Sequence, residues 1–234
     1  MNTKTFLPRA ACAGLFAALV AAAPLKADEW MKFGLGLHIV NPSGDLTNEK
    51  AVGVKAKMGL GLSAFGEMGL NANMALRGRL DYNVFGEGEK KESYRDYIDG
   101  YPVSMSESAK LNASATTVFA DFIYSFDSHE KGFYAFVGLG LVAGKLDYDI
   151  KVTASAEGIS PITESGSMSG SGSGLGISLG CGYNFNKNMG LELSWASANG
   201  VISEIKDKNG RRHTLENKDK ISFNWLQVSF KYRF

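Results

Sequence analysis

Apolar and polar residues alternate over long stretches of this chain. Over 226–234, every second residue is apolar or aromatic, and the residues between them are Gln, Ser, Lys and Arg. Successive side chains of a β-strand point to opposite faces, so this period of two predicts a strand with one apolar face and one polar face. Seven earlier stretches alternate in the same way: 30–40, 52–70, 74–85, 115–126, 133–152, 170–185 and 189–198. The sequence therefore predicts eight half-exposed strands.

The predicted connections between these stretches alternate between short and long. Short turns follow the second, fourth and sixth stretches, and longer polar segments follow the first, third, fifth and seventh. The turns cover 71–73, 127–132 and 186–188, and the longer segments cover 41–50, 86–112, 154–169 and 199–220. Two turns share an Asn-x-Asn-Met-x-Leu pattern, and Asn tolerates the positive φ angles of tight hairpins. Short turns at one end and long loops at the other are typical of outer-membrane barrels, with the turns and both chain ends in the periplasm.

The first 27 residues have the layout of a secretory signal peptide. Lys4 and Arg9 precede an apolar run over 10–23, and Ala27 is a small residue at a suitable cleavage point. The apolar run is shorter than the roughly 20 residues that a membrane-spanning helix needs. We therefore expect export and cleavage of 1–27, with 28–234 as the mature barrel domain. No later stretch is apolar enough for a spanning helix, so strands would have to cross the membrane.

The alternation alone does not say which face points inward. A soluble β-sandwich or a lipocalin-like barrel would bury the apolar faces and turn the charges to water. The export signal, the loop asymmetry and the terminal aromatic residue Phe234 favour apolar faces turned toward lipid. Ring closure removes sheet edges, whose unpaired backbone groups would each cost several kcal/mol in lipid. The predicted fold class is therefore all-β, an eight-stranded antiparallel up-and-down transmembrane β-barrel.

The closing stretch and the chain as a whole both resemble known proteins. Residues 226–234 resemble the C-terminal strand of bacterial outer-membrane barrels, which implies that Phe230, Tyr232 and Phe234 form a signal for the assembly machinery of that membrane. Residues 28–234 resemble the eight-stranded outer-membrane β-barrel superfamily, with OmpA-like membrane domains and opacity-type surface proteins. This resemblance implies a Gram-negative outer membrane with its lipid and lipopolysaccharide as partners, and we expect a monomer. The chain departs from full-length OmpA in that no peptidoglycan-binding domain follows the closing strand, so the resemblance does not imply a role in anchoring to the cell wall.

The polar faces would bring many charged side chains into one narrow lumen. Eight strands enclose a space that side chains can just fill, and unpaired charges there would be unfavourable. We therefore predict a salt-bridged network that plugs the barrel, with a narrow pore as the alternative. The polar faces supply Lys32, Lys55, Lys57, Glu67, Arg77, Arg79, Asp81, Asp121, Glu192, Lys231 and Arg233. Glycine-rich faces within 138–144 and 174–182 would make room for long side chains or leave a cavity.

Two functions fit this interior. The first is a structural or surface-interaction protein with a plugged lumen. The alternative is a small porin or an OmpW-like channel that passes small or hydrophobic solutes. The segment 86–112 carries Tyr94, Tyr97 and Tyr101 among charged residues, which would suit either a contact surface or a solvated loop.

Catalytic, metal and nucleic-acid chemistry have little support in the sequence. Enzymes exist on this scaffold, but His38, His129 and His213 do not form a pattern with a nucleophilic serine. No Cys or His pair has metal-ligand spacing, so we predict no enzyme, metal site or cofactor. Cys181 is the only cysteine left after cleavage, so no internal disulfide is expected. Removing Lys4, Arg9 and Lys26 leaves 22 of the 25 basic residues against 24 acidic ones, and this balance does not indicate nucleic acid.

Overall fold

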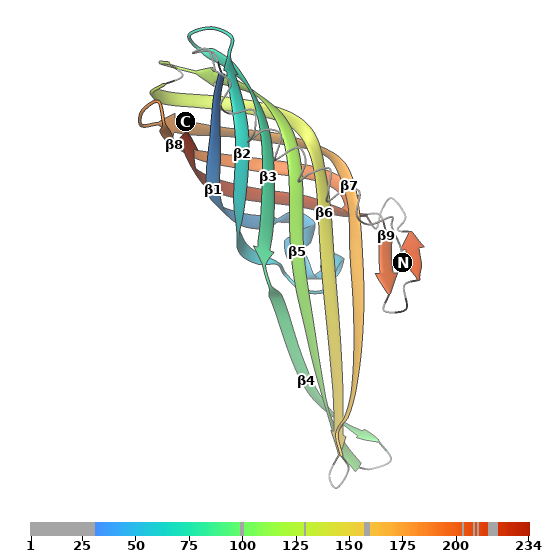
Figure 1. Ribbon diagram of the computed structural model, residues 1–234. Coiled ribbons are helices and arrows are strands. Elements are labelled where there is room, and N and C mark those ends of the chain that lie inside the picture. Colours follow the sequence, from blue (N-terminus) through green and yellow to red (C-terminus); the bar gives the residue numbers. More distant parts are fainter. Residues whose placement is uncertain are drawn as a thin grey trace.

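The computed structural model describes residues 31–98, 101–128, 130–156, 160–202, 204–207, 209, 211–214 and 220–234. The predicted signal peptide and His129 lie outside these residues. The chain is built almost wholly from strands (Figure 1). They are β1 (Met31–Ser43), β2 (Lys57–Gly69), β3 (Met74–Gly86), β4 (Gly88–Ile98), β5 (Tyr101–Ser125), β6 (Gly132–Ala156), β7 (Ile162–Asn184), β8 (Met189–Ile202), β9 (Glu204–Asp207), β10 (Arg212–Thr214) and β11 (Ile221–Arg233). No helix in the described part of the chain has the length and apolar character needed to cross a membrane.

Eight of the strands close into a ring. Their order is β1, β2, β3, β5, β6, β7, β8 and β11, and β11 pairs back onto β1. Every pairing around the ring is antiparallel. The predicted eight-stranded antiparallel barrel is therefore confirmed.

The apolar faces point outward, as predicted. Leu139 is 67% exposed, Leu193 45% and Phe230 46%, whereas their charged neighbours Glu192 and Lys231 are buried. In water so many exposed apolar side chains would be unfavourable, but they suit a surface that faces lipid.

Strands β4 to β7 continue far beyond the ring, at the end opposite the short turns (Figure 1). β5 and β6 have 25 residues each, whereas crossing a membrane takes roughly 9–11. The predicted loops 86–112 and 154–169 are therefore wrong over most of their length. They are strands, with β4 paired to β5 and the outer parts of β5, β6 and β7 paired to each other. We call this part of the sheet the outer extension (residues 88–98, 101–113, 145–156 and 162–173).

The polarity of the sheet inverts where the outer extension begins. Within the ring, the outward residues of β6 and β7 are apolar, and in the outer extension they are charged or polar. The inward residues change in the opposite sense, from the buried Asp121 on β5 to the apolar Leu111. The outward apolar residues are Val137, Leu139, Leu141, Leu175, Ile177 and Leu179, and the outward polar ones are Lys145, Asp147, Asp149, Lys151, Ser167, Ser169, Ser171 and Ser173. On β5 and β7 the sequence pattern predicts loops at or beyond this level because the outward apolar face ends here, while strand pairing continues. On β6 the predicted stretch 133–152 already runs into the outer extension.

Two short helical turns fill part of the barrel mouth at the outer end. They are η2 (Gly44–Thr47) and α2 (Glu49–Val52), which lie in the segment between β1 and β2. Leu46 is fully buried, and Asp45 Oδ2 accepts a hydrogen bond of 2.9 Å from the backbone of Ser222. Gly53 ends α2 with a φ of +73°, a conformation that favours glycine. Because α2 occupies 49–52, β2 begins at Lys57 and not at 52.

Candidate functional site: the barrel interior

Arg77 lies at the centre of a charged layer inside the ring. Its Nη1 atom is 2.7 Å from Glu192 Oε2, and its Nη2 atom is 2.8 Å from Asp121 Oδ2. Glu67 on β2 is also within 3.7 Å of the guanidinium. Arg77 therefore joins carboxylates from three other strands, and its side chain is fully buried.

The remaining cations extend this layer across the lumen. Arg79 contacts Asp81, Asp121 and Glu192 at 3.4–3.5 Å. Lys231 Nζ donates a hydrogen bond to Glu192, and Arg233 Nε donates one to Glu67 at 2.8 Å. The layer holds as many cations as carboxylates, which are Arg77, Arg79, Lys231 and Arg233 against Glu67, Asp81, Asp121 and Glu192. This balance satisfies the requirement that buried charges be paired.

Aromatic rings fill the space beside these charges. Arg77 lies 4.5 Å from the Phe136 ring centroid, and Lys231 lies 4.9 Å from that of Tyr134. The Tyr134 hydroxyl donates a hydrogen bond of 3.0 Å to Glu192. The glycine-rich faces receive these rings: a Cβ on Gly182 would be 2.3 Å from the Tyr134 hydroxyl. Of the two expectations for those glycines, space for large side chains is the one that the structure shows here, although the side chains are mainly aromatic.

An apolar layer fills the lumen between the charged layer and the mouth. Trp225 and Phe223 on β11 are fully buried, and Phe85 on β3 packs against both rings at centroid distances of 6.2 Å. Leu46 from η2 closes the cluster from outside. These residues were not among the predicted site residues, because β11 begins at Ile221, before the stretch that alternates most clearly. Extending the parity of 226–234 backward would have placed Trp225 and Phe223 inside.

A polar pair lies on the inward faces of β1 and β3, the two strands on either side of β2. His38 Nε2 is 2.7 Å from Asn83 Oδ1, and both side chains are buried. This pairing accounts for His38 as a structural residue. Within the described part of the chain, no group of three or more His, Cys, Asp or Glu is placed to hold a metal ion.

The structure brings eight of the eleven predicted network residues together and places the other three elsewhere. Lys32 pairs with Glu130 in the β5–β6 turn at 3.1 Å, and this hydrogen bond lowers the pKa of the exposed Glu130 carboxyl. Lys55 precedes β2 and pairs with Glu49 on the surface of the mouth. Lys57 is exposed, and the β2–β3 register is irregular between 57 and 60. Placing these three in the lumen network is therefore wrong. For Lys55 and Lys57, strand parity was extended past the end of the regular pairing, whereas Lys32 is regularly paired but lies next to the first residue of β1, within reach of the β5–β6 turn.

The predicted assembly residues lie on the outer surface. Phe230, Tyr232 and Phe234 are all exposed, on the lipid-facing side of the closing strand. The backbone N–H of Phe234 donates a hydrogen bond of 3.0 Å to the carbonyl of Phe33, so the end of the chain is held against β1.

The sequence matches the model of the family described as "Outer membrane protein beta-barrel domain" over residues 10–234. The chain belongs to this family. The barrel is therefore a bacterial outer-membrane protein, and its lipid-facing surface is that of an outer-membrane barrel. The prediction that it is not an enzyme stays a prediction.

Solved outer-membrane barrels have similar folds. Neisserial surface protein A is 15% identical, with 87% of this chain and 97% of that chain covered and a TM-score of 0.42. Ail, the attachment invasion locus protein of Yersinia pestis, in complex with the heparin analogue sucrose octasulfate, is 12% identical, with 88% and 97% covered and a TM-score of 0.40. The N-terminal β-barrel domain of Pseudomonas aeruginosa OprF is 14% identical, with 87% and 97% covered and a TM-score of 0.36. A comparison with curated proteins found no match.

Proposed function

We propose that this outer-membrane barrel is closed to solutes and has a structural and surface-interaction role in the envelope of a Gram-negative bacterium. The observation that carries the proposal is the filling of the lumen by two successive layers. The charged layer joins opposite walls of the ring through Arg77 and Glu192, and the apolar layer around Trp225 fills the space between it and the mouth. A solute would have to displace both layers to pass.

Conductance across a planar lipid bilayer tests the closed lumen. We expect no steady single-channel current from the purified barrel, with a reconstituted porin as the positive control. A steady current of reproducible size would contradict the closed lumen. It would favour the alternative, a small porin or an OmpW-like channel for small or hydrophobic solutes.

The outer extension supports the surface-interaction part of the proposal. More than half of β5 and of β6 lies beyond the length that a membrane requires, so the sheet would project past the lipid. Its outward face carries Lys145 just past the end of the apolar belt, with Lys110 and Lys151 farther along the outer extension. These cations are placed to meet lipopolysaccharide phosphates, although Lys110 and Lys145 also pair with Glu87 and Asp147.

Binding to lipopolysaccharide can be measured with these lysines exchanged. Changing Lys110, Lys145 and Lys151 to Gln should weaken binding to nanodiscs that contain lipopolysaccharide and leave binding to neutral phospholipid unchanged. The same exchange at Lys187 and Lys131, in the short turns at the other end, is the control. Equal binding by the two variants would argue against the outer extension as the contact surface.

The location of the chain ends and the assembly signal are also proposals. We propose that 1–27 is removed on export, so that mass spectrometry of the mature protein should find Asp28 first. The short turns and both chain ends would then lie in the periplasm.

We further propose that Phe230, Tyr232 and Phe234 are recognised by the assembly machinery. Deleting Phe234 should lower the amount of barrel in the outer membrane while the purified variant still refolds in detergent, and Phe126→Ser is the control at another exposed aromatic.

A further inference from the structure

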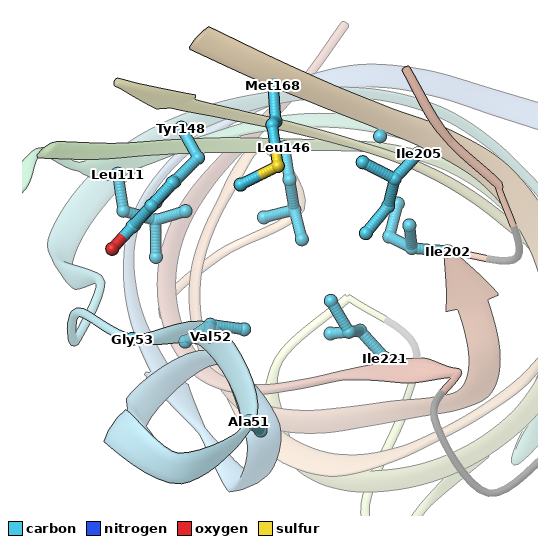
Figure 2. Close-up of a pocket in the computed structure, with 11 residues that line it drawn as sticks. Ala51, Val52, Gly53, Leu111, Leu146, Tyr148, Met168, Ile202, Ile205 and Ile221 are labelled. Atoms are coloured by element: carbon cyan, nitrogen blue, oxygen red, sulfur yellow. The ribbon is translucent and has the colours of Figure 1, made fainter. Parts of the chain in front are cut away.

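A cavity of about 230 Å³ lies at the outer mouth of the barrel. Figure 2 shows Leu146, Met168, Ile202 and Ile221 pointing into one space from different sides. The residues that line it come from β5, β6, β7, β8, β9, β11 and the α2 turn, so it is enclosed by parts of the chain that are distant in sequence. No charged side chain is among these described lining residues.

The floor of the cavity is the apolar layer of the lumen. Leu111 and Ile202 are fully buried members of that layer, and Leu146 and Ile221 also belong to it. The charged layer lies deeper in the ring. The cavity is therefore a closed-ended apolar space that opens toward the outside and does not lead through the barrel.

One polar group lies at the edge of this space. The Tyr148 ring lines the cavity, and its hydroxyl is on the side of Gly53, where a Cβ would be 2.8 Å from it (Figure 2). Among the described residues, the structure gives this hydroxyl no hydrogen-bond partner. Burial raises the pKa of the Tyr148 phenol, so the hydroxyl keeps its proton and can donate. The cavity thus offers an apolar interior and one donor at its rim.

We propose that the mouth cavity binds a free, uncharged aliphatic molecule of medium chain length that carries one polar end. At about 30 Å³ for each water-sized group, the cavity holds roughly eight such groups, which suits a chain of about eight carbons. The chain lies among Leu146, Ile202 and Ile221, and its oxygen accepts a hydrogen bond from Tyr148. The absence of charge from the described lining disfavours fatty-acid carboxylates, because a buried charge without a partner is costly.

The source of this molecule is the outer medium and not the bilayer. The lining residues lie on the inward side of the ring strands, whereas the lipid-facing residues of the same strands, such as Leu175 and Leu141, lie on the other side. A lipid acyl chain would have to pass through the hydrogen-bonded sheet between them. A free molecule in the outer medium does not have to cross that sheet.

Methyl NMR of the barrel in nanodiscs tests this proposal with n-octanol as the probe. The methyl signals of Ile202, Ile205 and Ile221 should shift and saturate, whereas those of the lipid-facing Ile39 and Ile177 should shift only in proportion to octanol in the bilayer. Affinity should rise about fourfold for each methylene from butanol to octanol and then level off. Shifts confined to Ile39 and Ile177 would overturn the proposal, because they would show partition into lipid alone.

Further experiments test whether octanol binds in the cavity and whether it enters from the outer medium or from the bilayer. Met168→Glu places a charge in the cavity and should abolish the saturable shift, whereas Ile162→Glu, on the same strand and the same face but outside the cavity, should keep it. Tyr148→Phe should weaken the binding of octanol several-fold and leave the binding of n-octane unchanged. Octanol added to the outer medium should shift Ile202 and Ile221 at concentrations below those that shift Ile39 and Ile177, and the reverse order would overturn the proposed source. Conductance tests the closed lumen independently of octanol binding. Failure of the proposed function and failure of the proposed cavity ligand would therefore give different results.

Discussion

Arg77 and Glu192 form an ion pair of 2.7 Å although they lie on strands at opposite sides of the ring. β3 and β8 are separated by three strands in either direction around the barrel. The pair therefore acts as a cross-brace through the lumen, and neighbouring cations and carboxylates hold each partner in place. A barrel with this brace has both a fixed cross-section and an obstructed lumen.

Removing the carboxylate of this brace should destabilise the barrel strongly. Glu192→Gln leaves Arg77, Arg79 and Lys231 short of one negative charge in a buried layer, and breaking such a pair costs about 3–5 kcal/mol. Unfolding in urea, followed by the loss of heat-modifiable migration on gels, measures the change. Glu130→Gln removes an exposed pair with Lys32 and should change stability by less than about 1 kcal/mol. Equal effects of the two variants would contradict the importance of the brace.

The depth of the sheet in the membrane can be tested on β6. Leu139 and Asp149 lie on the same outward face, one within the apolar belt and the other in the outer extension. Leu139→Arg should destabilise the barrel in lipid by about 2–4 kcal/mol, whereas Asp149→Arg should have an effect within about 0.5 kcal/mol. Folding into lipid vesicles provides the measurement. A large effect at Asp149 would show that the belt extends further than the structure indicates.

Two glycines should respond in opposite ways to the same substitution. Gly182→Ala would place a methyl group 2.3 Å from the Tyr134 hydroxyl, and overpacking of this kind costs about 1–3 kcal/mol. A methyl group on Gly78 of β3 would meet no described heavy atom within 4 Å beyond its chain neighbours. Gly78→Ala should therefore raise the free energy of unfolding by about 0.5–1 kcal/mol, because alanine restricts the unfolded chain. Chemical unfolding of both variants checks the difference, and a stabilising Gly182→Ala would argue against the packed lumen.

Cys181 should be protected from water-soluble reagents. It is exposed on the outward face of β7, within the apolar belt, so lipid should cover it. We expect no reaction with a membrane-impermeant maleimide in intact vesicles, and rapid reaction after denaturation. Ser167→Cys in a Cys181→Ser background places a thiol on the same face in the outer extension and should react at once. Rapid labelling of native Cys181 would contradict the orientation of the sheet.

The period of two was enough to predict the ring, because lipid requires an unbroken apolar face on every strand. It placed Glu192, Arg77 and Lys231 inside, since these residues lie in regularly paired parts of their strands. It failed for Lys55 and Lys57, where β2 has not yet begun or is irregular. It also missed β4 and the outer parts of β5 and β7, because polar outward residues such as Ser108 and Ser167 do not differ in composition from a solvated loop, whereas the stretch 133–152 already covered most of β6. Which charged residues pair across the lumen depends on how the strands are shifted relative to each other around the ring. The pattern along a single strand does not reveal this shift.

The inversion of polarity along β5, β6 and β7 fixes how deeply the barrel sits in the membrane. Sinking by one pair of residues would push Lys145 and Asp147 among acyl chains, and rising by the same step would strip lipid from Leu141 and Leu175. Both displacements are unfavourable, and the residues that make them so lie on the same strands that form the outer extension. The distance by which that extension projects from the membrane is thus set by the sheet itself.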